Sequence, residues 1–101
     1  MSINIEKIWM SQRNLRRKNQ IASIIESIKQ EIVLPPIVLS YCEDGEFQLE
    51  DGHHRLTAMW LYGKKTLEKG EYNVLNRDQW RTRCGKIEDL IQNAYKENNN
   101  V

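Results

Sequence analysis

The hydrophobic positions in the first third of the chain predict a short strand followed by a helix. Isoleucines alternate with polar residues at the N-terminus, which predicts a strand within residues 3–9. Beyond a polar, basic stretch, apolar residues recur with the spacing of an amphipathic helix, at Ile21, Ile24, Ile25 and Ile28. Asn19 is a suitable N-cap, so we expect this helix to run from Asn19 to about Glu31.

The middle of the chain has the pattern of a β-hairpin followed by a second helix. Residues 37–42 are apolar and β-branched, Asp44-Gly45 is a strong hairpin-turn signal, and residues 46–50 alternate with Phe47 and Leu49 on the buried face. The helix begins around His53 and ends at Gly63, which suits a left-handed C-terminal cap. Its buried side is formed by Leu56, Met59 and Trp60.

The remaining residues predict one more strand and a last helix. The strand lies within residues 71–75, and the helix spans about residues 78–97, with Asp78 as its N-cap and Gly85 as a point of division. The polar tail, residues 98–101, is expected to fray. One apolar face of the last helix is formed by Trp80, Cys84, Ile87, Leu90, Ile91, Ala94 and Tyr95.

This order of elements predicts a single α+β domain over residues 1–101, with a small mixed β-sheet and helices packed on it. We place its core at about residues 3–76. The length of 101 residues and the 40% apolar and 29% charged fractions are those of one globular domain and exclude intrinsic disorder. The net charge of +1 excludes a strongly basic nucleic-acid protein.

The lack of a visible targeting signal and the use of cysteine predict a cytoplasmic protein. No apolar run is long enough to cross a membrane, and no secretory signal is visible at the N-terminus. Cys42 and Cys84 have no metal-like spacing, and we interpret both as reduced thiols.

The candidate chemistry lies at the predicted junction between the hairpin and the second helix. Residues 36–63 carry five acidic residues and one basic residue, Arg55. A helix N-terminus favours anions, Gly52 would let a ligand approach the backbone, and Arg55 has the fork geometry that grips phosphate. His53 and His54 would lie at the mouth of this site, where they can donate hydrogen bonds or change protonation near neutral pH.

These residues also resemble a known family. Pro36-Ile37-Val38, Asp44-Gly45 and the string Asp51-Gly52-His53-His54-Arg55 with Ala58 are similar to the N-terminal domain shared by ParB partition proteins and sulfiredoxins. The likeness runs from about Ile5 to Leu75 and is closest to the serine-kinase-like and phage-type branches. It implies a ParB/sulfiredoxin-like fold and a nucleotide ligand, of the ATP, ADP or CTP class.

The departures from the family restrict the chemistry. His53 stands where sulfiredoxins carry their reactive cysteine, which argues against sulfinic acid reduction. His54 and Thr57 stand where partition proteins carry arginine, and both are included among the phosphate-binding candidates. The chain stops before the helix-turn-helix domain of partition proteins, so we do not expect centromere binding. Arg13 and Arg16 lie in a loop that is near the nucleotide in the family, although solvation alone also explains such a basic loop.

Carboxylates supply the candidate catalytic and metal-binding groups. Asp51 or Glu50 would carry Mg²⁺ bound with the nucleotide or position a nucleophile, and His54 is a further catalytic candidate. An alternative interpretation is that Asp51 is the N-cap of the helix. Glu6 is the candidate that resembles the base of the serine kinases.

Two functions follow as expectations. The first is nucleotide or phosphate binding, with phosphoryl transfer or nuclease-like phosphodiester hydrolysis as the natural chemistry if the ligand is turned over. The alternative is a non-catalytic module that binds DNA or protein, encoded by a phage or mobile element. The residues leave the choice between enzyme and binding module open.

Overall fold

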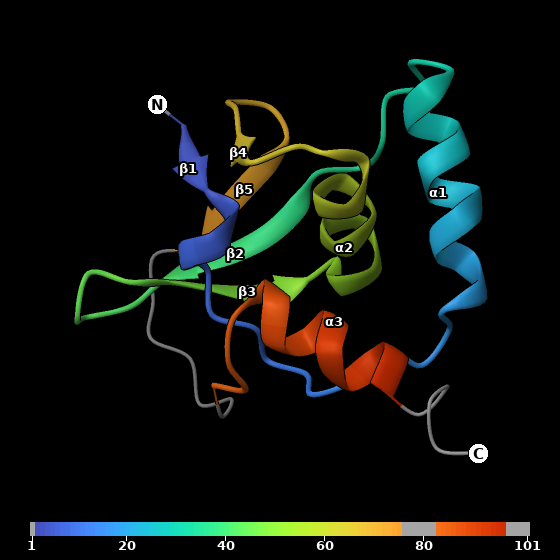
Figure 1. The fold of residues 1–101 in the computed structure, drawn as a ribbon. Coiled ribbons are helices and arrows are strands. Elements are labelled where there is room, and N and C mark those ends of the chain that lie inside the picture. The colour runs from blue at the N-terminus through green and yellow to red at the C-terminus, as the bar shows by residue number, and fades with distance from the viewer. Residues whose placement is uncertain (1, 76–82, 97–101) are drawn as a thin grey trace.

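The computed structural model describes residues 2–75 and 83–96, which form two small sheets with helices packed beside them (Figure 1). The elements in chain order are β1 (Ile3–Asn4), the 3₁₀ helix η1 (Ile5–Lys7), α1 (Asn19–Lys29), β2 (Ile37–Tyr41), β3 (Phe47–Asp51), α2 (His53–Tyr62), β4 (Thr66–Leu67), β5 (Tyr72–Leu75) and α3 (Ile87–Lys96).

The larger sheet is mixed, as the sequence predicts. β2 lies at its centre, with β3 antiparallel on one side and β5 parallel on the other. β1 and β4 form a separate antiparallel pair. The helix α2 follows β3 after a single residue and lies between the larger sheet and α1 in Figure 1. The first turn of α2 is therefore fixed at the end of β3.

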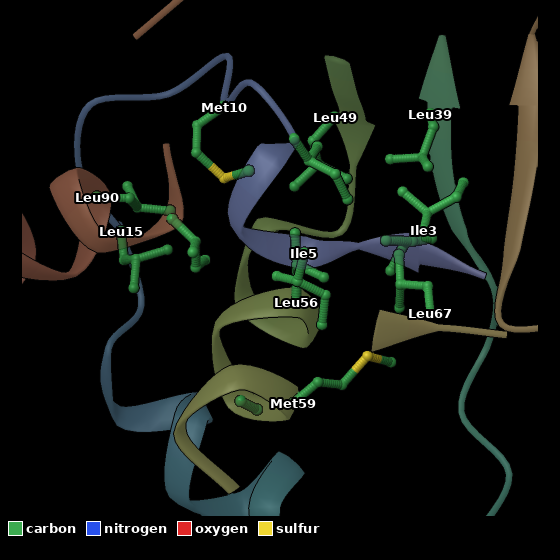
Figure 2. Packing of buried hydrophobic residues seen from close by; sticks show 14 of the residues in the cluster. Ile3, Ile5, Met10, Leu15, Leu39, Leu49, Leu56, Met59, Leu67 and Leu90 are labelled. Atoms are coloured by element: carbon green, nitrogen blue, oxygen red, sulfur yellow. The ribbon is translucent and has the colours of Figure 1, made fainter. Parts of the chain in front are cut away.

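The core joins both sheets to the helices. Leu39 and Leu49 come from the larger sheet and Leu56 from α2, and all three are fully buried (Figure 2). Ile5 and Leu67 bring η1 and β4 into the same cluster. Burying apolar surface from every element stabilises the domain and holds the β3–α2 junction in place.

Two predictions for the N-terminal part of the chain, the length of its strand and the cap of its helix, are wrong. The strand expected within residues 3–9 is limited to Ile3–Asn4, because the chain turns into η1, and Trp9 then makes an isolated bridge with Gln48. Asn19 is the first residue of α1 rather than its cap: the cap position is Lys18, and no side chain caps the helix.

The hairpin and the C-terminal region differ from prediction in detail. Phe47 is half-buried, whereas Gln48, on the opposite face of the strand, is buried. Trp9 pairs with the edge of β3 at this point, since its N–H donates to the Phe47 carbonyl and its carbonyl accepts from the Leu49 N–H. The last helix was predicted over about residues 78–97, but its described part begins at Ile87. Residues 83–86 are not helical, and the left-handed φ of +99° at Gly85 interrupts the helical backbone there. Asp78 and Trp80 lie outside the described residues.

The C-terminus of α1 contains a residue in an unfavourable conformation, which leads to a stability prediction. The Glu31 N–H donates to Ile28 O and the Ile32 N–H to Ser27 O, which is the Schellman pattern. Glu31 occupies its left-handed position, with φ of 59°, where glycine is preferred. Glu31→Gly is expected to raise the free energy of unfolding by about 0.5–1 kcal/mol.

Urea unfolding measures this effect as a higher midpoint with an unchanged slope. Glu31→Gln is the matched control, because it removes the charge and keeps the Cβ atom, and it should leave the midpoint near that of the unmodified protein. A gain of the same size in the glutamine variant would assign the effect to charge instead of backbone strain.

Candidate functional site

A cavity of about 390 Å³ opens at the start of α2. Its walls come from the β3–α2 junction, the segment before α1, the first half of α1 and the segment between α1 and β2. The residues that line it are Gln12, Gln20, Ile24, Leu34, Pro35, Asp51, Gly52, His53, His54 and Arg55. The volume falls within the range of small-molecule sites in proteins.

Gly52 is required at the junction by the packing of the backbone. Its φ of +108° lies in the left-handed region, and a Cβ atom there would lie 2.7 Å from Ile37 Cγ2. The same Cβ position lies 3.1 Å from Arg55 Nη2, so the guanidinium folds over the face of this glycine. The close approach predicted for a ligand is therefore made in part by the protein's own side chains.

The start of α2 has no side-chain cap. Gly52 itself is the N-cap residue, so the interpretation of Asp51 as the cap is wrong. Asp51 turns toward Arg55 instead, because the left-handed Gly52 intervenes between the end of β3 and the first helical residue. A helix start of this kind offers its first-turn N–H groups and its positive dipole end to an anion.

Arg55 is held loosely for a charged side chain that is mostly buried. Its side chain is 23% exposed, and its Nη2 lies 3.4 Å from Asp51 Oδ2, a long contact to a carboxylate that is itself 76% exposed. Within the described ranges, its buried Nε has no hydrogen-bond partner. Because Arg55 lines the cavity and its contact with Asp51 is long, its guanidinium can turn to an anion there, and such a shift would also let the Nε donate.

The two histidine rings were predicted to lie at the mouth of the site and to donate hydrogen bonds there. In the structure, each ring instead accepts a hydrogen bond from the backbone. His53 is 3% exposed, and its Nε2 accepts a hydrogen bond of 3.1 Å from the Ser11 N–H. His54 Nε2 accepts one of 3.1 Å from the Arg17 N–H. Burial, and secondarily the charge of Arg17, lower the pKa of His54 below its usual value, so its neutral form is favoured at neutral pH.

The other candidate residues do not line the cavity. Thr57 is buried, and its Oγ1 donates to the His53 carbonyl within α2. Glu50 accepts a hydrogen bond of 2.9 Å from Ser40 Oγ. Glu6 lies on η1, and Arg13 and Arg16 lie in the segment held by the histidines; these three side chains are exposed.

The described side chains alone do not form a metal site. Over residues 2–75 and 83–96, no three His, Cys, Asp or Glu side chains gather as a metal site. Asp51 is the carboxylate that lines the cavity. One carboxylate together with nucleotide phosphates fits the way Mg²⁺ is commonly bound, so Asp51 remains a candidate in that setting only.

Half of the cavity wall was not predicted as part of a site: Gln12, Gln20, Ile24, Leu34 and Pro35. The sequence predicts Ile24 as part of the apolar stripe of a helix that ends near Glu31, before Pro35. This pattern does not reveal that α1 and the following segment pack beside the β3–α2 junction, because that proximity is a property of the tertiary fold.

The cysteines and helices add two observations. Within the described residues, neither Cys42 nor Cys84 forms a disulfide; Cys42 is buried and Cys84 is half-buried. No helix in the described parts of the chain has the length and apolar character needed to span a membrane.

Known proteins share this fold and sequence pattern. The sequence matches the ParB N-terminal domain family over residues 1–89. The structure is similar to the crystal structure of the C-terminally truncated chromosome-partitioning protein ParB from Caulobacter crescentus complexed with CTP-γ-S, with a TM-score of 0.58 and 22% identity. This similarity covers 96% of the present chain and 51% of the Caulobacter chain, so the chain spans about half the length of that protein. No curated protein matches the sequence.

Proposed function

This chain belongs to the ParB N-terminal domain family, and from that premise we propose that it binds a nucleotide of the CTP class in the cavity at the start of α2. The structurally similar Caulobacter protein was crystallised with CTP-γ-S, which supports CTP over ATP and ADP as the first ligand to test. In the proposed complex the phosphates lie against Gly52 and Arg55.

The observation that carries the proposal is the incompletely satisfied guanidinium of Arg55 beside an uncapped helix start. Charge-assisted hydrogen bonds from a guanidinium fork to phosphate oxygens are strong, and the helix dipole adds to the attraction. Ile24, Leu34 and Pro35 give the cavity apolar lining, which suits the less polar ribose and base. The lining thus combines polar and apolar groups, as a nucleotide does.

Asp51 gives a test of whether Mg²⁺ accompanies the nucleotide. Without Mg²⁺, this carboxylate repels phosphate and competes for Arg55, so Asp51→Asn is expected to bind CTP about two- to fivefold more tightly. With Mg²⁺, the unmodified protein is expected to bind more tightly than without it, and the variant should lose most of that gain.

Isothermal titration of both proteins, with Mg²⁺ and with EDTA, measures these four affinities. Glu50→Gln is the matched control, since Glu50 precedes Asp51 in the chain and is bonded to Ser40 instead of lining the cavity. An unchanged Mg²⁺ effect in Asp51→Asn would exclude Asp51 as the residue that carries the ion.

Turnover is a separate part of the proposal. Phosphoryl transfer and phosphodiester hydrolysis depend mainly on positioning and charge neutralisation, which the Arg55 end of the cavity would supply. Of the carboxylates predicted to be catalytic, Asp51 is the one that lines the cavity, so hydrolysis would depend on it. Release of inorganic phosphate from CTP, lost in Asp51→Asn, would support an enzyme.

A nucleotide panel tests the proposed function against its alternatives. Saturable binding of CTP, tighter than that of ATP, GTP or ADP, supports the proposal. Binding to DNA that weakens steeply with salt, without saturable nucleotide binding, would favour a DNA-binding module. Absence of binding to every nucleotide and to DNA would favour a protein-interaction role.

A further inference from the structure

We propose that His54 is a positioning residue, whose neutral ring holds the segment of residues 11–17 against the first turn of α2, so that CTP binding weakens when the ring is protonated. This inference rests on the proposed function, because the segment it holds forms part of the nucleotide cavity. It assigns the adjacent histidines a role other than direct phosphate binding.

The segment is attached to the α2 start at two points. Ser11 N–H donates to His53 Nε2 at 3.1 Å, and the Ser11 hydroxyl donates to the Leu49 carbonyl at 2.7 Å. Six residues later, the Arg17 N–H donates to His54 Nε2, also at 3.1 Å. Gln12, which lies between these points, lines the cavity. The two adjacent rings therefore set the position of one cavity wall.

The direction of the hydrogen bond fixes the protonation state of His54. A backbone N–H can only donate, so the Nε2 atom that receives it must carry a lone pair. In the neutral ring the proton is then on Nδ1. The imidazolium has protons on both nitrogens and no acceptor, so protonation removes the contact to Arg17 and places two donors against each other.

The surrounding charges oppose protonation of His54. Arg17 faces the ring from the segment, and Arg55 lies one position further along α2. Asp51 lines the same cavity but is directed to Arg55, and the α1 wall presents the uncharged Gln20 and Ile24. Burial, and secondarily the charge of Arg17, lower the pKa of His54 below the usual histidine value. The contact is therefore favoured at neutral pH and is lost as the pH falls through the lowered pKa of the folded state.

The sign of the pH effect separates this role from direct phosphate binding. A histidine that binds phosphate as a cation would strengthen CTP binding on acidification. A histidine that must stay neutral to hold the cavity wall would weaken it, by at most about tenfold for each pH unit below its folded-state pKa. The two roles thus predict opposite slopes for the same titration.

The test measures CTP affinity between about pH 7.5 and pH 5 for the unmodified protein, His54→Gln and His54→Leu. Glutamine can place an uncharged acceptor where Nε2 lies, so it should bind more tightly than leucine and lose the part of the pH dependence that comes from residue 54. Any contribution of His53, whose Nε2 accepts from the Ser11 N–H, is common to all three proteins. Leucine should bind weakly throughout. The titration of CTP itself is common to all three proteins, so the difference between their slopes isolates His54.

Amide hydrogen exchange of Arg17 in the ligand-free protein gives a readout that does not depend on nucleotide binding. Protection of this amide should fall on acidification in the unmodified protein, stay constant in His54→Gln, and be absent in His54→Leu. If CTP does not bind at any pH, the proposed function fails while this exchange still tests the contact. Tighter CTP binding at low pH, or a leucine variant with unaltered affinity and unaltered protection, would overturn the inference.

Discussion

Arg55→Ala is expected to reduce CTP affinity by about 100-fold while changing the free energy of unfolding by no more than about 1 kcal/mol. The first number corresponds to about 2.7 kcal/mol, which lies within the range of about 1.5–3 kcal/mol for a hydrogen bond to a charged group. The second follows from the weak internal contacts of the side chain, because its ion pair with Asp51 is long and its partner is exposed. Titration calorimetry and urea unfolding measure the two quantities.

Two further variants make this result specific. Arg55→Lys keeps the charge but not the planar fork, so it should bind with intermediate affinity. Arg83→Ala is the matched control, because Arg83 is similarly exposed, pairs with Asp44 at 2.7 Å and does not line the cavity. Its CTP affinity should equal that of the unmodified protein. An Arg55→Ala variant that loses several kcal/mol of stability would make Arg55 a structural residue instead.

Gly52→Ala is expected to destabilise the fold by about 2–4 kcal/mol and to abolish CTP binding. Its φ of +108° is unfavourable for any side chain, and the new Cβ atom would lie 2.7 Å from Ile37 Cγ2 on β2. Relief of that overlap requires the β3–α2 junction to move away from β2, which displaces Arg55 and the first turn of α2. Gly52→Val adds two methyl groups to the same overlap and should be more damaging.

Gly63 offers a control for backbone strain alone. It has a φ of +110°, nearly the same as that of Gly52, but a Cβ atom there would meet nothing within 4 Å. Gly63→Ala should therefore cost about 1–2 kcal/mol and leave CTP binding intact. Equal losses of stability in the two alanine variants would show that the contact with Ile37 is unimportant.

Local signals predicted the elements that position the site. The α2 helix begins at His53 and ends before Gly63 as expected, because its apolar spacing and its terminal glycine lie within one short stretch. The two-residue strand β4 has no comparable signal, since it exists through its pairing with β1, more than 60 residues earlier in the chain. Ile5 and Ile8 are both fully buried, in and beside a 3₁₀ turn, whose three-residue repeat places positions i and i+3 on the same side.

The parts of the candidate site that are formed by residues close together in the sequence could be predicted. Gly52 and Arg55 lie within one turn of each other, so their proximity follows from the helix start. The partners of the histidines could not be predicted, because Ser11 and Arg17 are 42 and 37 residues away and approach only after α1 packs against α2. Thr57 was included by resemblance to arginine positions in partition proteins, but its small side chain bonds within its own helix.

The most direct test of the account is an amide NMR titration of the ¹⁵N-labelled unmodified protein with CTP in the presence of Mg²⁺. We predict saturable shifts at Gly52–Arg55, with smaller ones at Gln12 and Gln20, which also line the cavity. A second cavity of about 330 Å³, lined by Ile28, Tyr62 and Gly70 among others, provides an internal comparison. Saturable shifts that cluster there, with none at Gly52–Arg55, would contradict the claim that the start of α2 binds the nucleotide.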